Sequence, residues 1–307
     1  MNHLFCADLS QQQDDPLAGS ATHAERNLLI SWPRAKWLRS MRHASDMSAE
    51  LKKSLDAVAE SGVRINLIQR PGMDKHHHQI FLMPERQRFS VERGQLASFI
   101  TALQAGRCLA KWQQLPLEND LVLCCTHGKK DKCCAKYGYQ AYKALATTTA
   151  EHSLPFDIWE SSHLGGCRLA ASIIVLPNVR KYGRITPEQA LPFLKAEASN
   201  ERYLPGFRGD SQLTPAQQCS QLAALRYLSP SEPSSYEPSQ PQLTLIDDNG
   251  DEQERVIGWQ WQRGETQGKL SVRCQAVTIM RVDSCSDLEQ GPTESVVWRM
   301  INIEQAR

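Results

Sequence analysis

The sequence predicts an α/β fold followed by a small antiparallel β unit. Before residue 229, short apolar segments with the two-residue period of strands alternate with segments that have the 3.6-residue period of helices. A stretch rich in proline and serine at 229–242 then interrupts this regularity. Beyond it, every apolar segment has the strand pattern, which is typical of a separate β unit.

Residues 1–118 are predicted to form an N-terminal α/β segment that packs on the rest. Ser48 suits a helix N-cap, Leu51, Leu55 and Val58 share one helix face, and Gly62 ends the helix. The predicted strands are 27–32, 63–69 and 79–83, and the predicted helices are 48–61 and 95–103.

Residues 119–228 are predicted to form a second α/β domain. Thr186 and Thr214 each precede a proline, which is typical of the first residues of a helix. Before them in the sequence, a helix is predicted at 135–147, with an interruption near Gly138. One of the two helices that these threonines precede begins at 187, and the other spans 215–228. A helical turn is predicted at 166–171. The predicted strands are 121–124, 156–160, 172–176 and 182–185, and the last two form a hairpin.

The C-terminal β unit is predicted at 243–307, after the linker at 229–242. Its strands are expected at 243–246, 256–262, 269–280 and 296–303. We find no internal repeat in the sequence.

The composition is that of an ordinary globular protein. A chain of 307 residues that is 41% hydrophobic can bury a sizeable core. Its net charge of +1 argues against binding nucleic acid or a membrane surface through broad electrostatic attraction. The N-terminus is polar and acidic and no apolar run would span a bilayer, so we expect a cytoplasmic protein with reduced thiols.

Ligand-type side chains gather in two short segments. The segment 124–134 contains four of the ten cysteines and one histidine, and the segment 160–167 contains His163 and Cys167. Each follows a predicted strand, and the crevice beyond strand ends is where α/β sheets bind ligands. Thiolates together with imidazole suit zinc or an iron–sulfur cluster. Gly165 and Gly166 allow the backbone to wrap closely around such a centre.

These segments carry motifs that resemble the sucrase/ferredoxin-like family of thioredoxin-like [2Fe–2S] proteins. The motifs are Cys-Thr-His-Gly-x-x-Asp-x-Cys-Cys at 125–134, Trp-Glu-x-Ser-His-Leu-Gly-Gly-x-Arg at 159–168, Val-Leu-Pro at 175–177 and Tyr-Gly-Arg at 182–184. Cys6 with Pro-Leu-Ala-Gly at 16–19 is similar to the family's opening, and Val-Asp-Ser-Cys at 282–285 to its end. The resemblance implies a thioredoxin-like ferredoxin core between the N-terminal segment and the C-terminal β unit.

The resemblance also implies the cluster ligands. They are Cys125, Cys134, His163 and Cys167, with Cys133 as a substitute for Cys134. The family has a His-x-x-x-His motif, and Cys167 stands where many relatives carry the second histidine. A thiolate in place of a neutral imidazole adds a negative charge, so the reduction potential should be lower than in a two-histidine relative.

Several functions are compatible with these ligands. A non-enzymatic carrier would transfer one electron to or from an unknown redox partner and would need no catalytic residues. A thiol redox protein is disfavoured because the sequence lacks Cys-x-x-Cys, and a structural zinc site would use the same ligands. Sucrose hydrolysis is unlikely because no facing pair of carboxylates is recognisable.

The remaining candidates have simpler interpretations. We expect Cys6, Cys108, Cys219 and Cys274 to be small buried hydrophobic residues. The run 76–78 of three histidines is expected in a solvated loop and Trp159 in the core. The lysines at 129, 130 and 132 either steer an acidic partner or only offset the charge of the cluster. Arg168 either acts on the partner or the cluster charge as these lysines do, or forms a surface salt bridge.

Overall fold

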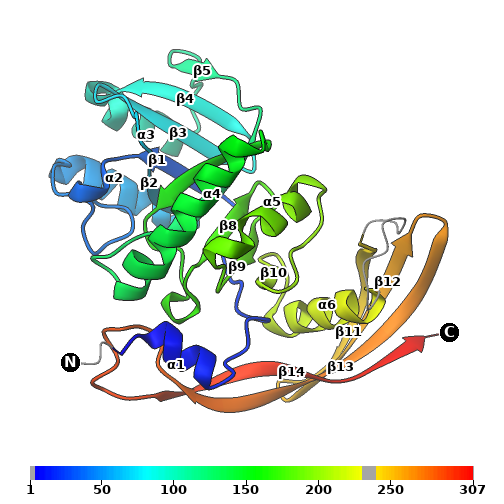
Figure 1. Ribbon diagram of the computed structural model, residues 1–307. Coiled ribbons are helices and arrows are strands. Elements are labelled where there is room, and N and C mark those ends of the chain that lie inside the picture. Colours follow the sequence, from blue (N-terminus) through cyan, green and yellow to red (C-terminus); the bar gives the residue numbers. More distant parts are fainter. Residues whose placement is uncertain (1–3, 230–239, 307) are drawn as a thin grey trace.

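The computed structural model describes residues 4–229 and 240–306 and confirms the predicted α/β architecture. One mixed sheet has ten strands in the order β10-β9-β8-β6-β7-β2-β1-β3-β4-β5, and a separate antiparallel sheet has the order β11-β12-β13-β14 (Figure 1). No helix among the described residues is long and apolar enough to cross a bilayer.

The first half of the large sheet is a βαβββα unit, here called the first unit. It comprises β1 (Asn27–Ser31), α2 (Ala49–Glu60), β2 (Arg64–Gln69), β3 (His77–Met83), β4 (Gln87–Glu92) and α3 (Leu96–Gln104). β2 is parallel to β1, whereas β3 and β4 are antiparallel additions, and β5 (Gln113–Leu115) extends the edge. Ser48 accepts the N–H of Leu51 at 3.1 Å, as expected of the predicted N-cap.

The second half, here called the second unit, repeats this order. It comprises β6 (Asp120–Cys125), α4 (Tyr139–Glu151), β7 (Phe156–Ser161), β8 (Ile173–Leu176), β9 (Arg180–Tyr182) and α5 (Ala190–Ala198). β6 and β7 are parallel, and β8 and β9 are antiparallel additions. A βαβ element followed by a ββα element is the thioredoxin-like topology. β10 (Phe207–Asp210) completes the edge.

The two units meet through β2 and β7, which pair antiparallel at Ile68 with Ser161 and at Gln69 with Glu160. Sheet pairing therefore continues across the predicted boundary at 118/119. The sequence shows no repeat, because a topology requires only matching apolar periods and leaves the side chains free to differ. The first unit contains no cysteine at all, whereas the second carries both ligand-rich segments.

The C-terminal sheet packs on α6 (Pro215–Leu228). Its strands are β11 (Gln242–Gly250), β12 (Glu254–Arg263), β13 (Thr266–Arg281) and β14 (Thr293–Ala306). Trp259, which is fully buried, donates its indole N–H to Ser220 of α6 at 2.6 Å. The long β13–β14 ribbon runs from α6 back to the N-terminal helix α1 (Cys6–Gln12), so the connection between β13 and β14 lies beside α1 (Figure 1).

Some predicted elements were wrong or missing. The second strand of the hairpin lies at Arg180–Tyr182, not at 182–185, because the backbone turns to a positive φ of 56° at Arg184. Four elements were not predicted, α1, β4, β5 and β10, which are short or rich in polar residues. Most of the predicted linker, at 230–239, lies outside the described residues, and its end at Gln242 begins β11.

The histidine run is not a solvated loop throughout, because β3 begins within it. His78 is only 4% exposed, its ring stacks on Trp32 with centroids 4.5 Å apart, and its Nδ1 donates to the Ser31 carbonyl at 2.6 Å. His76 and His77 are exposed, as expected. Burial lowers the pKa of His78.

We therefore expect His78→Gln to flatten the acid side of the stability profile. Below the unfolded-state pKa of about 6.5, the unfolded chain binds a proton that buried His78 does not, so stability falls as pH drops. Removing one such group reduces the slope of the free energy of unfolding by at most about 1.4 kcal/mol per pH unit. Urea unfolding at several pH values checks this, with His77→Gln as the matched control. An unchanged slope in His78→Gln would contradict the prediction.

Candidate metal centre

The first ligand-rich segment begins with Cys124 and Cys125, the last two residues of β6, and the residues that follow them are here called the cysteine loop (126–133). Cys124 and Cys125 are adjacent in the strand and therefore point to opposite faces of the sheet. Cys124 packs in the core beneath α4 and donates to the carbonyl of Gly138 at 3.2 Å, whereas Cys125 lies in the apolar layer on the other face. A Cβ at Gly138 would collide with the carbonyl of Cys125, so glycine permits this close approach. The helix is interrupted there as predicted, by a π-helical turn at Cys134–Gly138.

The second segment follows β7 and is here called the histidine loop (162–167). Gly165 and Gly166 have φ values of 86° and 75°, which favour glycine, and a Cβ at Gly166 would lie 2.8 Å from the Arg208 guanidinium. The loop is held from the first unit. Arg64 donates to the carbonyl of His163 at 2.7 Å, and Asn66 donates to the same carbonyl at 3.1 Å. One role of the N-terminal segment is thus to fix the loop that carries His163.

His127 links the two loops. Its Nε2 donates to the carbonyl of Leu38 at 2.7 Å, and its Nδ1 accepts the backbone N–H of His163 at 3.2 Å. Both ring nitrogens are therefore occupied, and burial lowers the pKa of this histidine. His127 positions the histidine loop and has no nitrogen left for a metal.

The structure brings together Cys125, Cys134, His163 and Cys167. The Sγ atoms of Cys134 and Cys167 are 3.9 Å apart, and the Sγ of Cys167 is 3.5 Å from Nδ1 of His163. The thiol of Cys125 interacts with both Cys134 and His163, which closes the group. The three cysteines are buried in an apolar layer with Trp159, which is in the core as predicted, while His163 is half-buried.

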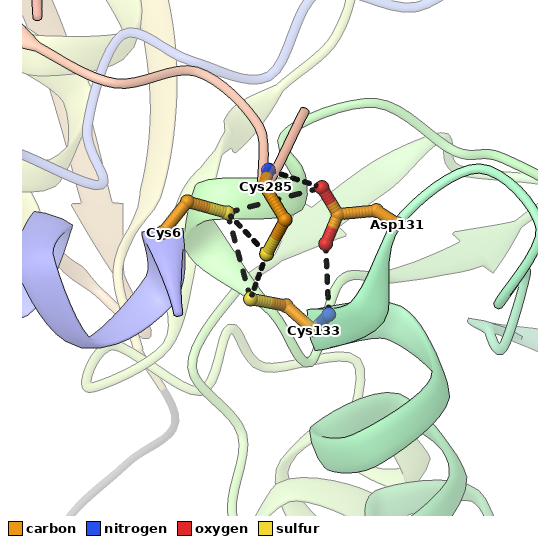
Figure 2. Close-up of side chains that lie close together, drawn as sticks. All are labelled: Cys6, Asp131, Cys133 and Cys285. Carbon is orange, nitrogen blue, oxygen red and sulfur yellow. Dashed lines mark hydrogen bonds between the residues drawn. The ribbon is translucent and has the colours of Figure 1, made fainter. Parts of the chain in front are cut away.

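The sulfur of Cys133 makes its contacts with other thiols. This Sγ lies 3.5 Å from that of Cys6 and 3.4 Å from that of Cys285 (Figure 2). The two neighbouring thiols therefore belong to different clusters, and it is Cys134 that lies beside Cys167.

The thiols and the imidazole perturb one another. A hydrogen bond from Cys134 keeps the pKa of Cys125 well below its usual range. Burial alone would lower the pKa of His163, but hydrogen bonds to Cys125 and Cys167 outweigh it and raise that pKa to about 9. Metal ligands must be deprotonated, so a metal at this position would displace protons from these groups.

Three cations surround the same group. Lys181 donates to the carbonyl of Leu164 at 2.8 Å and Arg208 to that of Gly165 at 3.3 Å, and Arg64 binds the loop as described above. Lys181 and Arg208 are buried. Within residues 4–229 and 240–306, none of the three forms an ion pair with a carboxylate. Burying unpaired charge is costly, so this environment favours an anionic group at the thiols.

Burial lowers the pKa of each of these cations, and the thiolates oppose that shift. The pKa of Arg64 falls to about 10 and that of Arg208 to about 9, while that of Lys181 falls well below its usual value. The negative charge of Cys125 acts on Arg64 and Lys181, and that of Cys167 on Arg208. The cations are therefore electrostatically coupled to the ligand-type thiols.

The burial of the other residues named in the sequence analysis agrees only in part with the predictions. The interpretation of Arg168 as a surface residue was wrong, because its buried side chain pairs with Asp15 at 2.5 Å. Cys108 is exposed, contrary to the prediction, whereas Cys219 and Cys274 are buried as expected. Cys6 is buried, but it contacts other thiols. Sequence reasoning did not identify Asp131 and Cys285 as companions of Cys6, since no local spacing connects them.

Comparison with known proteins places the chain in a family. The model of the family described as sucrase/ferredoxin-like matches residues 17–209. The chain belongs to the sucrase/ferredoxin-like family. This match spans both units of the large sheet and includes both loops of the candidate metal centre.

One relative is Altered inheritance of mitochondria protein 32 of Clavispora lusitaniae, which is 31% identical over 81 residues. The alignment covers 25% of this chain and 30% of that protein. The sucrase/ferredoxin-like chain therefore matches less than a third of this relative's length.

Solved structures of a thioredoxin-like [2Fe–2S] ferredoxin from Aquifex aeolicus also resemble part of this family member. One is 15% identical, covers 30% of this chain and 91% of the ferredoxin, and has a TM-score of 0.26. Another is 14% identical, covers 30% of this chain and 97% of the ferredoxin, and also has a TM-score of 0.26. At these values the likeness carries no weight for the site, so the donor atoms and their surroundings must support any metal centre by themselves.

Proposed function

We propose that this protein binds a [2Fe–2S] cluster through Cys125, Cys134, His163 and Cys167 and transfers single electrons. The observation that carries the proposal is the convergence of these donors, from the two residues that flank the cysteine loop and from the histidine loop, beside cations that have no carboxylate partner in the described part of the chain. Membership of the sucrase/ferredoxin-like family supports the choice of cluster.

The donor set fits an anionic cluster. Three thiolates outnumber the positive charge of an oxidised [2Fe–2S] core, so the centre is negative and reduction makes it more so. Arg64, Lys181 and Arg208, which donate to carbonyls of the histidine loop, stabilise that charge. The backbone N–H of His127 donates to the thiolate of Cys125, as donors around other metal sites do.

When bound, the cluster supplies one-electron redox chemistry. The residues around the cluster would set its reduction potential and its exchange of protons with solvent. The apolar layer around Cys125 and Cys134 keeps water away, the thiolate at Cys167 favours a low potential, and half-buried His163 is the ligand that can exchange a proton with solvent. We assign no catalytic residue, because electron transfer needs none.

We also propose that the redox partner is an acidic protein. Lys132 and Lys136 are exposed next to the cysteine loop. Lys129 is exposed too, but its ammonium group donates to the carbonyls of Ala35 and Trp37 at 3.0 and 2.7 Å. The ammonium group of Lys136 is likewise occupied, since it donates to the Tyr137 hydroxyl at 3.0 Å. Steering of the partner therefore falls chiefly to Lys132, which attracts negative charge over a distance of about one Debye length.

Purification without oxygen tests the proposal. We expect a reddish-brown protein whose visible absorption bleaches with dithionite, an EPR signal in the reduced state, and about two irons and two sulfides per chain. A colourless protein that takes up neither iron nor sulfide on reconstitution would overturn the proposal, whatever zinc it carries.

A further inference from the structure

A second group of thiols lies beside the proposed cluster site and comes from three distant parts of the chain. Cys6 begins α1, Cys133 ends the cysteine loop, and Cys285 lies between β13 and β14 (Figure 2). Their Sγ atoms form a triangle, with separations of 3.5 Å for Cys6–Cys133, 3.4 Å for Cys133–Cys285 and 3.6 Å for Cys285–Cys6. We call it the trithiol cluster.

Asp131 completes the group. Its Oδ1 accepts the backbone N–H of Cys133 at 2.8 Å, and its Oδ2 accepts that of Cys285 at 2.8 Å (Figure 2). The same Oδ2 lies 3.9 Å from the Sγ of Cys6. The three sulfurs and one carboxylate oxygen are all within 4.8 Å of one another. A carboxylate oxygen with one hydrogen bond retains a lone pair that can bind a metal.

We propose that the trithiol cluster and Asp131 bind a zinc-type divalent cation, separate from the [2Fe–2S] cluster. Tetrahedral zinc takes thiolates at about 2.3 Å and carboxylate oxygens at about 2.1 Å, which places neighbouring sulfurs about 3.8 Å apart. The observed triangle is only a few tenths of an ångström smaller. An ion about 2.3 Å from each sulfur would lie about 1 Å from their plane, so small outward shifts of the side chains would admit it.

A disulfide explains the arrangement less well. Bonded sulfurs are about 2.05 Å apart, whereas all three cysteines are free thiols here. A disulfide would also join only two of the thiols. The third thiol and the carboxylate of Asp131 would take no part in it. A tetrahedral cation uses all four donors.

The surroundings of the trithiol cluster suit a metal. The backbone N–H of Ala7 donates to the Sγ of Cys133 at 3.4 Å, and the two N–H groups that bind Asp131 hold its carboxylate in place. Cys6, Cys133 and Asp131 are buried, but Cys285 is only half-buried and leaves a path from solvent. A supported ligand shell and an entry path are what a protein metal site requires.

The cation would fasten helix α1 and the connection between β13 and β14 to the cysteine loop. It joins Cys133 to residues 127 and 152 positions away in sequence. Because Cys133 adjoins Cys134, it would also fix the turn that presents Cys134 to the iron–sulfur centre. Bringing together such distant segments costs loop-closure entropy, which the metal–ligand bonds would offset.

Metal analysis of the variants tests the proposal. The purified chain, incubated with zinc sulfate and desalted, should hold one zinc equivalent in addition to its iron. Cys285→Ala and Cys6→Ala should each weaken zinc binding at least 100-fold, roughly the largest effect known for second-shell changes, and should keep iron and the visible spectrum. Cys108→Ala, at an exposed thiol, should retain both metals. Cys134→Ala should lose iron and keep zinc, which separates this proposal from the proposed function.

Three results would overturn it: wild-type protein that takes up no zinc, unchanged zinc affinity in Cys285→Ala, or loss of iron together with zinc in that variant. If the variants do not fold, thiol alkylation of the wild-type chain gives the answer. Zinc should then protect Cys6, Cys133 and Cys285 from alkylation and leave Cys108 reactive. Equal alkylation with and without zinc, or a disulfide within the trithiol cluster of the zinc-treated protein, would also refute the proposal.

Discussion

Replacing Cys134 with alanine is expected to abolish iron binding, whereas the same change at Cys133 should preserve it. Cys134 lies 3.9 Å from Cys167 within the proposed ligand set, and Cys133 contacts Cys6 and Cys285 instead. Alanine offers no donor, so a [2Fe–2S] cluster would have one open position in the first variant and none in the second. The iron content of Cys134→Ala should fall at least about tenfold, with loss of the visible absorption.

The pair of variants controls for folding as well. Both thiols are fully buried on the same turn, so each truncation removes a similar volume, and a buried side chain of this size costs about 1–2 kcal/mol. Iron and sulfide assays with circular dichroism on both proteins separate misfolding from ligand loss. Iron retained in Cys134→Ala but absent from Cys133→Ala would reverse the assignment.

Replacing Cys167 with histidine should keep the cluster and raise its reduction potential. A neutral imidazole in place of a thiolate removes one negative charge from the centre, so adding an electron becomes easier. Clusters in which two histidines replace two cysteines have potentials several hundred mV higher, so we expect a rise on the order of 100 mV for one. A second imidazole should also make the potential depend more strongly on pH, because reduction increases proton affinity.

A redox titration followed by visible absorption and EPR measures this change. Cys108→His introduces the same side chain at an exposed position and should leave the potential where it was. A Cys167→His protein whose potential stays constant or falls would remove Cys167 from the ligand set.

The first unit supports the candidate metal centre without contributing any of its donor atoms. Its Arg64 and Asn66 hold the carbonyl of His163, and the segment after β1 accepts hydrogen bonds from His127 and Lys129. The first unit is thus a scaffold for the loops of the second unit, which has the same topology. Nothing in the local sequence of 27–104 indicates this role, because these contacts depend on the antiparallel junction between β2 and β7.

The sequence could predict most helices and strands, because each depends on a local pattern. The Thr214–Pro215 start and the apolar period of α6 are examples, and so is the serine cap of α2. It also identified the two ligand-rich loops at strand ends. Among the missed elements, α1 with its glutamines lacks an apolar period of its own and forms because the rest of the molecule covers it.

By itself, then, the sequence determined the α/β class, the family resemblance and the candidate ligands Cys125, Cys134, His163 and Cys167, since motifs and periods are properties of neighbouring residues. Only the tertiary structure decided that Cys133 and Cys134 face different groups and that His78 and Arg168 are buried. It alone brought Cys6 and Cys285 together across 279 positions. Contacts between distant segments depend on how packed elements are oriented, and that orientation minimises the free energy of the whole chain.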